Sequence, residues 1–336
     1  MPRLFDPSLR HRPTGRYRRV LSCMINQKAK TQLCPETPRL DGKLALVTGG
    51  TGGIGAEIVK GLSRRGAQVI VAARGGGDTE ATLETWAHQT GGQIGFLPLD
   101  LGNLNAVAQA TRVFEDRWHG RQLDIICANA GISPHQHSLS ADGFEKAFAV
   151  NCLGHHLLIR RFIERALLSD QASIVGTTGD IYVLAKDCSS DFTYGGRGLA
   201  AYCRSKLGNL WQYAELAERY PDLRVIAVHP GVVATALEGP TDGVAGTIKR
   251  AMMLSPELGA QASLIAATQD QLESGEYIHN KHGRMTLGPD DAAKAKRHSE
   301  DFWHELEQIC APYLAEWVED DRTVTPISVN AERTGT

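Results

Sequence analysis

Short apolar runs alternate along this chain with longer stretches whose apolar residues recur at helical spacing. The first run covers 44–48, and after a glycine-rich break Ile58, Val59 and Leu62 fall on one helix face. A second apolar run follows at 68–73. Short continuous runs of this kind are typical of strands buried on both faces of a parallel sheet. The pattern therefore predicts a strand–helix–strand unit with a right-handed, parallel connection.

The same alternation continues with apolar runs at 94–99 and 124–128 and a helical pattern at 103–118 between them. Further on, we expect an amphipathic helix at 258–268 and a last strand at about 275–278. Repeated strand–helix units predict an α/β fold, in which a doubly wound parallel sheet lies between two helical layers. We expect a single domain over residues 41–317.

The break after the first strand is rich in glycine and reads Thr48-Gly49-Gly50-Thr51-Gly52-Gly53-Ile54-Gly55. Glycines let the backbone approach a pyrophosphate, whose charge is stabilised by the N–H groups at the start of the following helix. From Gly50 the stretch fits the dinucleotide fingerprint G-x-G-x-x-G. A plain glycine-rich turn is the alternative, because the chain has 35 glycines.

The end of the second strand indicates which dinucleotide is bound. NAD-binding proteins place an acidic residue there to bind the ribose hydroxyls, whereas this chain has Ala73 followed by Arg74. A guanidinium matches a 2′-phosphate, so Arg74 favours NADP over NAD. The alternative is a surface arginine beside the glycines at 75–77.

Composition narrows the classes of function. The formal net charge is -2, and residues 1–40 carry nine Lys and Arg against two acidic residues, so the remainder is mildly acidic. A mildly acidic body argues against nucleic-acid binding. The apolar runs fall far short of the roughly 18 residues of a membrane span. We expect a soluble, cytoplasmic protein whose partner is a small molecule, with a homodimer as a possible assembly.

The cysteines and histidines do not indicate a metal site. The seven cysteines are scattered without CxxC spacing, which is typical of reduced thiols in the cytoplasm. The late histidines are too loosely spaced for metal ligands: His279, His282, His298 and His304. No metal is therefore expected.

The two ends of the chain lack an apolar face. Residues 1–40 combine arginines with prolines and show no helical stripe, so we expect a flexible basic arm that does not pack on the body. A transit peptide and a true start at Met24 are alternatives. Residues 318–336 are expected to form a flexible tail.

Six motifs follow one another along the chain: the glycine loop, Asp100-Leu101, Asn129-Ala130-Gly131, Asn151, Tyr202-Cys-Arg-Ser-Lys206, and Pro230-Gly231 with Thr235. Their order and approximate spacing resemble those of the short-chain dehydrogenase/reductase family, over about residues 41–317. Several of the motifs are most similar in sequence to the retinol dehydrogenase and WW-domain oxidoreductase branch.

This resemblance implies a Rossmann-type fold and a set of cofactor contacts. The loop residues Thr48, Gly49, Thr51, Gly53, Ile54 and Gly55 would hold the pyrophosphate. Asp100 and Leu101 would border the adenine, and Asn129 to Gly131 would support the nucleotide side of the sheet. Pro230, Gly231 and Thr235 would lie at the nicotinamide, with Thr235 on its carboxamide. Asn151 would hold a water that links the active-site lysine to solvent.

Tyr202 and Lys206 are four residues apart, so they share one helix face. A free phenol titrates near pH 10, and lowering its pKa to about 7 requires about 4 kcal/mol of preferential stabilisation of the phenolate. A nearby ammonium and an oxidised nicotinamide can supply energy of that order. We expect Tyr202 to be the acid/base of a hydride-transfer reaction between an alcohol and a carbonyl, with Lys206 lowering its pKa.

One position departs from the family pattern. Where the family has a catalytic serine, alignment of 173–180 gives Gly179. We expect the hydroxyl of Thr178 to donate to the substrate oxygen instead, with Thr177 as second choice. The 23 residues from Gly179 to Ala201 are expected to overhang the substrate pocket with polar and aromatic side chains, namely Asp180, Tyr182, Asp187, Asp191 and Tyr194. The segment 237–254 is expected to be a mobile lid.

Two other functions remain open at this point. The missing serine is compatible with a non-catalytic NADP-binding sensor or scaffold. A threonine at this strand end also resembles the pattern of light-dependent protochlorophyllide reductases, which share the fold and the Tyr/Lys pair. A photo-reductase is therefore the second alternative.

Overall fold

The computed structural model describes residues 15, 19, 20, 23, 25–195, 198–234 and 253–315. Its centre is one eight-stranded sheet in the order β3-β2-β1-β4-β5-β6-β7-β8. All neighbouring strands are parallel except β7 and β8. The strands are β1 (Leu44–Thr48), β2 (Gln68–Ala73), β3 (Gln93–Pro98), β4 (Leu123–Ala128), β5 (Leu168–Thr177), β6 (Arg224–His229), β7 (Tyr277–His279) and β8 (Gly283–Met285).

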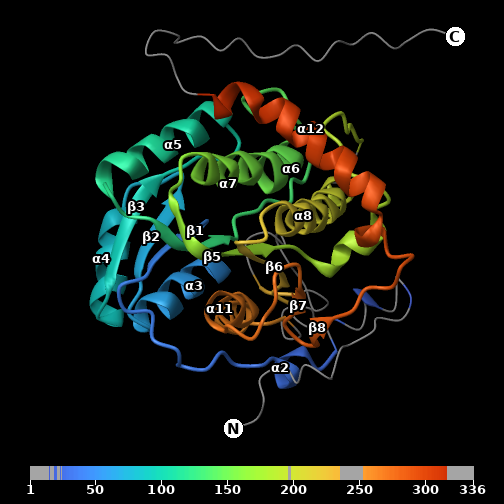
Figure 1. The fold of residues 1–336 in the computed structure, drawn as a ribbon. Coiled ribbons are helices and arrows are strands. Elements are labelled where there is room, and N and C mark those ends of the chain that lie inside the picture. The colour runs from blue at the N-terminus through green and yellow to red at the C-terminus, as the bar shows by residue number, and fades with distance from the viewer. Residues whose placement is uncertain are drawn as a thin grey trace, which may run out of the picture.

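Helices cover both faces of the sheet (Figure 1). The longer ones are α3 (Gly53–Arg64), α4 (Thr79–Thr90), α5 (Leu104–Arg117), α7 (Gly154–Glu164), α8 (Leu199–Arg219), α11 (Gln261–Thr268) and α12 (Lys296–Leu314). Short helices are α2 (Gln27–Lys30), α6 (Lys146–Phe148), α10 (Pro256–Gly259), the π-helix η1 (Ala149–Leu153) and the 3-10 helices η2 (Asp180–Leu184) and η4 (Ala292–Lys294).

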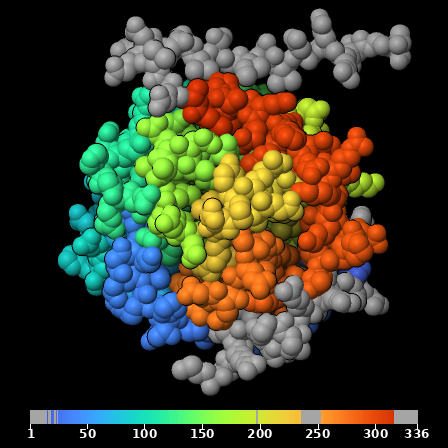
Figure 2. Space-filling view, in the orientation of Figure 1, coloured from blue at the N-terminus to red at the C-terminus, as the bar shows by residue number. Residues whose placement is uncertain are grey.

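Two apolar cores hold the layers together, one on each face of the sheet. The first joins the sheet to α5, α7, α8 and α12. The second joins it to α3, α4 and α11. In the space-filling view α12 (red) runs along the rim of the molecule beside α8 (yellow) (Figure 2). The predicted doubly wound α/β/α fold is therefore confirmed.

The strand order places the carboxyl ends of β1, β4, β5 and β6 at one edge of the sheet. Strands β2 and β3 are added on one side of β1, and β4 and the later strands on its other side, so the strand order reverses between β1 and β4. In open α/β sheets, ligands bind at the carboxyl edge where the strand order reverses. The glycine loop, the Asn129 turn and the end of β5 all lie there.

Two predictions for the C-terminal third need correction. The predicted amphipathic helix at 258–268 is divided into α10 and α11, and seven of the eight residues of α11 are buried. The helix packs against the sheet and α3, so it has no polar face. The expected last strand is the short parallel strand β7, and it is followed by an antiparallel strand, β8.

The expectation that residues 1–40 do not pack on the body is wrong for the residues that the structure describes. Arg19, Cys23 and Gln27 are buried, and so is Leu40. Their contacts are mostly polar, since Arg19 binds Asp180 and Gln27 binds the main chain of Val232. Polar anchoring leaves no apolar periodicity in the sequence, which explains the error.

Three predictions fall wholly or largely on residues outside the described ranges: Thr235, the segment 237–254 and the tail 318–336. Within the described ranges, no helix is long and apolar enough to cross a membrane.

Candidate active site

A cleft of about 770 Å³ runs along the carboxyl edge of the sheet, from the glycine loop to the end of β6. Two glycines of the loop could not carry side chains. Gly49 has a φ of +65°, and a Cβ on Gly55 would lie 2.2 Å from the carbonyl oxygen of Gly49. The backbone before α3 is therefore as close-packed as a pyrophosphate cradle requires.

The structure places most of the predicted cofactor residues on the wall of this cleft. They are Gly49, Thr51, Gly53, Ile54, Gly55, Arg74, Asp100, Leu101, Asn129, Ala130, Gly131, Pro230 and Gly231, with Tyr202 and Lys206. Thr48 lies behind the loop and is fully buried. Its Oγ1 accepts hydrogen bonds of 3.0 Å from the backbone N–H groups of Asn129 and Ala130, so it ties β1 to the end of β4.

Arg74 lies at one end of the cleft. It is exposed and lines the wall together with Gly75, Gly76 and Thr79. Asp100, after β3, also lines the wall, and its Oδ1 accepts from the backbone N–H of Gly102 at 2.9 Å. This end thus offers a guanidinium, glycine backbone and a turn closed by a carboxylate.

Tyr202 and Lys206 lie at the other end, one turn apart on α8. The Lys206 Nζ is 5.5 Å from the centroid of the Tyr202 ring. It donates to the carbonyl oxygen of Thr177 at 3.1 Å and to Oδ1 of Asn209 at 3.4 Å. Burial lowers the pKa of Lys206 to about 8. The pair therefore combines a phenol on the cleft wall with a desolvated amine that the end of β5 holds in place.

Asn151 does not line the cleft; it is buried in the π-helix η1 behind it. Its Oδ1 accepts from Ile132 N at 2.8 Å, and its Nδ2 donates to Ser205 Oγ at 2.9 Å. Its carbonyl oxygen receives the Nδ2 of Asn209 at 2.6 Å. The side-chain amide of Asn209 thus bridges Lys206 and Asn151. No role for Asn209 was expected from the sequence, although it follows Lys206 by one helical turn.

The comparison with known proteins decides the family. The sequence matches the short chain dehydrogenase family over residues 43–243. The chain belongs to the short-chain dehydrogenase/reductase family. It is therefore an NAD(P)-dependent oxidoreductase acting on alcohol or carbonyl groups of small molecules.

The individual similarities agree with the retinol dehydrogenase branch. Retinol dehydrogenase 12 from Homo sapiens is 34% identical over 260 residues, which cover 73% of this chain and 80% of the relative. A short-chain dehydrogenase/reductase from Armillaria gallica is 28% identical over 312 residues, covering 88% and 98%. The crystal structure of an uncharacterised Mycobacterium paratuberculosis protein, 26% identical, superposes with a TM-score of 0.66 and covers 83% and 98%.

The structure does not support the role expected for Thr178 in this short-chain dehydrogenase. Thr178 lines the cleft but is 2% exposed, and its hydroxyl donates to the carbonyl oxygen of Lys206 at 2.8 Å. The hydroxyl hydrogen is therefore used to join β5 to α8 and does not point to a substrate. Thr177 is half-buried and also lines the cleft.

Gly179, at the family's serine position, has room for a side chain. A Cβ built there would have Ile181 and Lys206 carbons at 3.8 Å and Nδ1 of His229 at 3.9 Å, all ordinary contacts. Its φ of −166° is extended backbone that any residue adopts. A Cβ at this position would thus make only ordinary contacts, on backbone that any residue adopts.

The 179–201 insertion contributes less to the cleft than expected. Among its described residues, Gly179, Asp180 and Ile181 line the wall, whereas Tyr182 is fully buried. The later part of the insertion forms hydrogen bonds away from the cleft. Ser190 bonds with Glu305 of α12, Asp187 with Arg204, and Tyr194 with Glu145.

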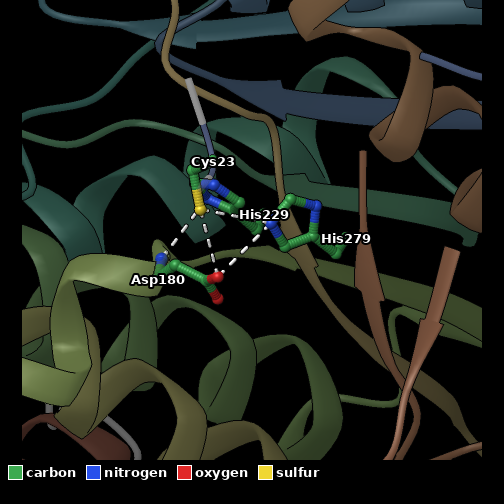
Figure 3. A group of neighbouring side chains, drawn as sticks. All are labelled: Cys23, Asp180, His229 and His279. Carbon is green, nitrogen blue, oxygen red and sulfur yellow. Dashed lines mark hydrogen bonds and ion pairs between the residues drawn. The ribbon is translucent and has the colours of Figure 1, made fainter. Parts of the chain in front are cut away.

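A buried polar cluster lies at the substrate end, and no sequence motif indicates it. Ligand-type atoms of Cys23, Asp180, His229 and His279 lie within 4.8 Å of one another (Figure 3). His229 and His279 pair directly at the ends of the adjacent strands β6 and β7. This parallel pairing, rather than sequence spacing, brings the histidines together.

The hydrogen bonds assign protons within this cluster. Nδ1 of His279 accepts from Lys281 N at 3.0 Å, so the ring proton lies on Nε2, which is 3.3 Å from Oδ2 of Asp180. A histidine that binds a metal through Nε2 keeps its proton on Nδ1. The same Oδ2 accepts from Arg19 Nε at 3.0 Å. The cluster is therefore arranged as a hydrogen-bond network around Asp180.

Charge in the network is concentrated on Asp180 and Arg19. Burial alone would raise the pKa of Asp180, but hydrogen bonds from His279 and Arg19 hold it well below its usual range. Burial lowers the pKa of His229 to about 3 and raises that of the Cys23 thiol. The carboxylate is thus ionised and balanced by one guanidinium, while the thiol and His229 are neutral.

Proposed function

We propose that this short-chain dehydrogenase is NADP-dependent and interconverts an alcohol and a carbonyl on a medium-sized, partly apolar small molecule. The observation that carries the proposal is the placement of Arg74 at one end of the cleft and the Tyr202/Lys206 pair at the other. When bound, the nicotinamide supplies or accepts the hydride. The protein's own groups supply the proton and the orientation.

In the reducing direction, Tyr202 donates its proton to the carbonyl oxygen as negative charge develops there. The ammonium of Lys206, close to the ring, stabilises the resulting phenolate electrostatically. The carbonyl of Thr177 and the amide of Asn209 orient this ammonium. In the oxidising direction the same groups act in reverse, with the phenolate accepting the alcohol proton.

Cofactor choice is proposed to rest on Arg74. A guanidinium binds a phosphate bidentately, and Ala73 offers no acceptor for a free ribose diol. Losing a charged hydrogen bond costs about 1.5–3 kcal/mol. Arg74→Ala should therefore reduce the preference for NADPH over NADH by roughly tenfold to a hundredfold. Calorimetric titration measures both affinities, and equal binding of the two cofactors by the unmutated protein would overturn the NADP assignment.

Turnover is tested by following NADPH absorbance with a panel of alkyl ketones and aldehydes. Consumption of NADPH that depends on the carbonyl compound supports the proposal. Tight NADPH binding without turnover of any carbonyl or alcohol would instead favour the non-catalytic sensor. A requirement for light would favour the photo-reductase.

A further inference from the structure

The described residues between Arg19 and Cys34, here called the strap (Arg19, Val20, Cys23 and 25–34), pack against the carboxyl edge of the sheet. Val20 and Cys23 line the cleft together with Asp180, Ile181 and Tyr202. A segment far from Tyr202 in sequence therefore forms part of the wall beside the reacting end.

Arg19 anchors the first part of the strap. Its Nε and Nη2 donate to the two carboxylate oxygens of Asp180 at 3.0 and 2.7 Å, and both side chains are at most 5% exposed. Its Nη1 also donates to Tyr182 at 2.9 Å and to Asp291 at 3.2 Å. Removing one partner of such a buried ion pair leaves an uncompensated charge, so the pair fixes the strap to η2.

The second part of the strap holds the loop after β6. The Oε1 of Gln27 accepts from Val232 N at 3.0 Å, and its Nε2 donates to Val232 O at 3.1 Å. Further along, Thr31 Oγ1 accepts from Asn280 at 3.2 Å, and Cys34 N donates to Gln261 at 2.7 Å. Contacts along its whole length thus position the strap across the ends of β5, β6 and β7.

We propose that the strap is the outer wall of the substrate site, that Val20 selects the substrate, and that the site takes uncharged, apolar carbonyl compounds or alcohols. This inference rests on the proposed function. Besides Val20, the wall presents Ile181 and Val232. The carboxylate of Asp180 on this wall is neutralised by Arg19. A charged group placed against this wall would lose its hydration without gaining a partner there.

Stability measurements test the strap without any substrate. Deleting residues 1–24 removes Arg19, Val20 and Cys23, whereas deleting 1–14 retains the whole strap. We expect the longer deletion to lower the melting temperature by about 5 °C or more and the shorter one to leave it unchanged. Equal melting of both deletions and the parent would overturn the proposal.

A double-mutant cycle covers the case in which the longer deletion fails to fold. Arg19→Met and Asp180→Asn should each lower the melting temperature, and the double variant should lose less than the sum of the two. Additive losses would show that Arg19 does not anchor the strap through Asp180.

Chain-length preference tests the role in selection. With NADPH and a series of methyl ketones from 2-butanone to 2-decanone, Val20→Trp should lower kcat/KM for the longest member at least tenfold relative to the shortest. Val20→Ala should shift the preference the other way. Ile25→Trp, on an exposed part of the strap, should leave the chain-length preference unchanged. An unchanged length preference in Val20→Trp would overturn the assignment of Val20.

A carboxylate-bearing ketone of matched length, such as a keto acid, should be turned over at least tenfold less efficiently than the methyl ketone. If the parent turns over none of these compounds, the proposed function fails. The deletions and the double-mutant cycle then still decide whether the strap is a built part of the fold.

Discussion

Gly179 stands where the resemblance to the family leads us to expect a serine, and the structure shows room for a Cβ there. The position has extended backbone, and a Cβ placed there would meet no other atom closer than 3.8 Å. A Cβ there would lie beside Lys206 and His229, at the reacting end of the cleft.

Gly179→Ser should therefore increase activity. A preorganised donor to a developing oxyanion contributes about 2.7–4 kcal/mol in comparable sites. If the unmutated enzyme lacks this donor, the variant should raise kcat by roughly tenfold or more, with NADPH affinity unchanged. Gly179→Ala is the matched control, because it adds the Cβ without the hydroxyl. An activity no higher for serine than for alanine would mean that another donor, such as Thr177, already serves the substrate oxygen.

At the scale of elements, α8 and η1 form the frame of the proton-transfer site. The amide of Asn209 joins them, because it contacts both Lys206 and the carbonyl of Asn151 and is 1% exposed. The side-chain amide of Asn209 thus connects the lysine on α8 with η1 directly.

Asn209→Leu should lower kcat by about tenfold or more, since it leaves the Asn151 carbonyl and Lys206 without a polar bridge and fills the space. Asn209→Ala should lose less, because a water has room and polar partners there. Steady-state kinetics, together with calorimetric NADPH affinities, distinguishes the loss of the polar bridge from misfolding. If the alanine variant is the poorer of the two, the bridge is not what Asn209 provides.

Elements differ in how well the sequence predicts them. The strands β1, β2, β3 and β4 follow from continuous apolar runs, because burial on both faces leaves no other pattern. The strap does not, because it docks through Arg19, Cys23 and Gln27, whose polar contacts have no periodicity. The pattern at 258–268 predicts an amphipathic helix, but tertiary packing buries α11 on nearly all sides.

The site shows the same division. Gly49, Gly55, Arg74, Tyr202 and Lys206 could be placed from their motifs, because each motif ties residue type to a position at the sheet edge. The Asp180 network could not, because its members come from four segments that only the sheet order brings together. The occupied hydroxyl of Thr178 likewise depends on how β5 packs against α8.

At the scale of the whole molecule, buried neutral histidines make stability depend on pH. Burial lowers the pKa of His155 to about 4 and that of His229 to about 3, compared with 6.5 for an exposed histidine. Between these values the unfolded chain binds more protons than the folded one. The free energy of unfolding should therefore decrease as the pH is lowered from about 6.5 towards these pKa values.

Denaturant unfolding between pH 7 and 4 should show this loss. The lowered pKa of His155 alone corresponds to a loss of about 3 kcal/mol in the free energy of unfolding once His155 of the unfolded chain is fully protonated. His155→Gln should flatten the acid limb while costing some stability at pH 7, because Thr48 Oγ1 loses the ring nitrogen 2.9 Å away. If His155→Gln loses stability between pH 7 and 4 as steeply as the parent, groups other than His155 set the pH dependence.

The central claim is that Tyr202 transfers the proton in an NADP-dependent reaction. The most direct measurement compares Tyr202→Phe with the parent, by NADPH-linked turnover of the best ketone and by calorimetric NADPH affinity. We expect turnover to be lost and NADPH affinity to stay within a few-fold, because the substitution removes the proton donor and little of the cofactor's contact surface. Substantial residual turnover in Tyr202→Phe would contradict the account and assign proton transfer to another acid.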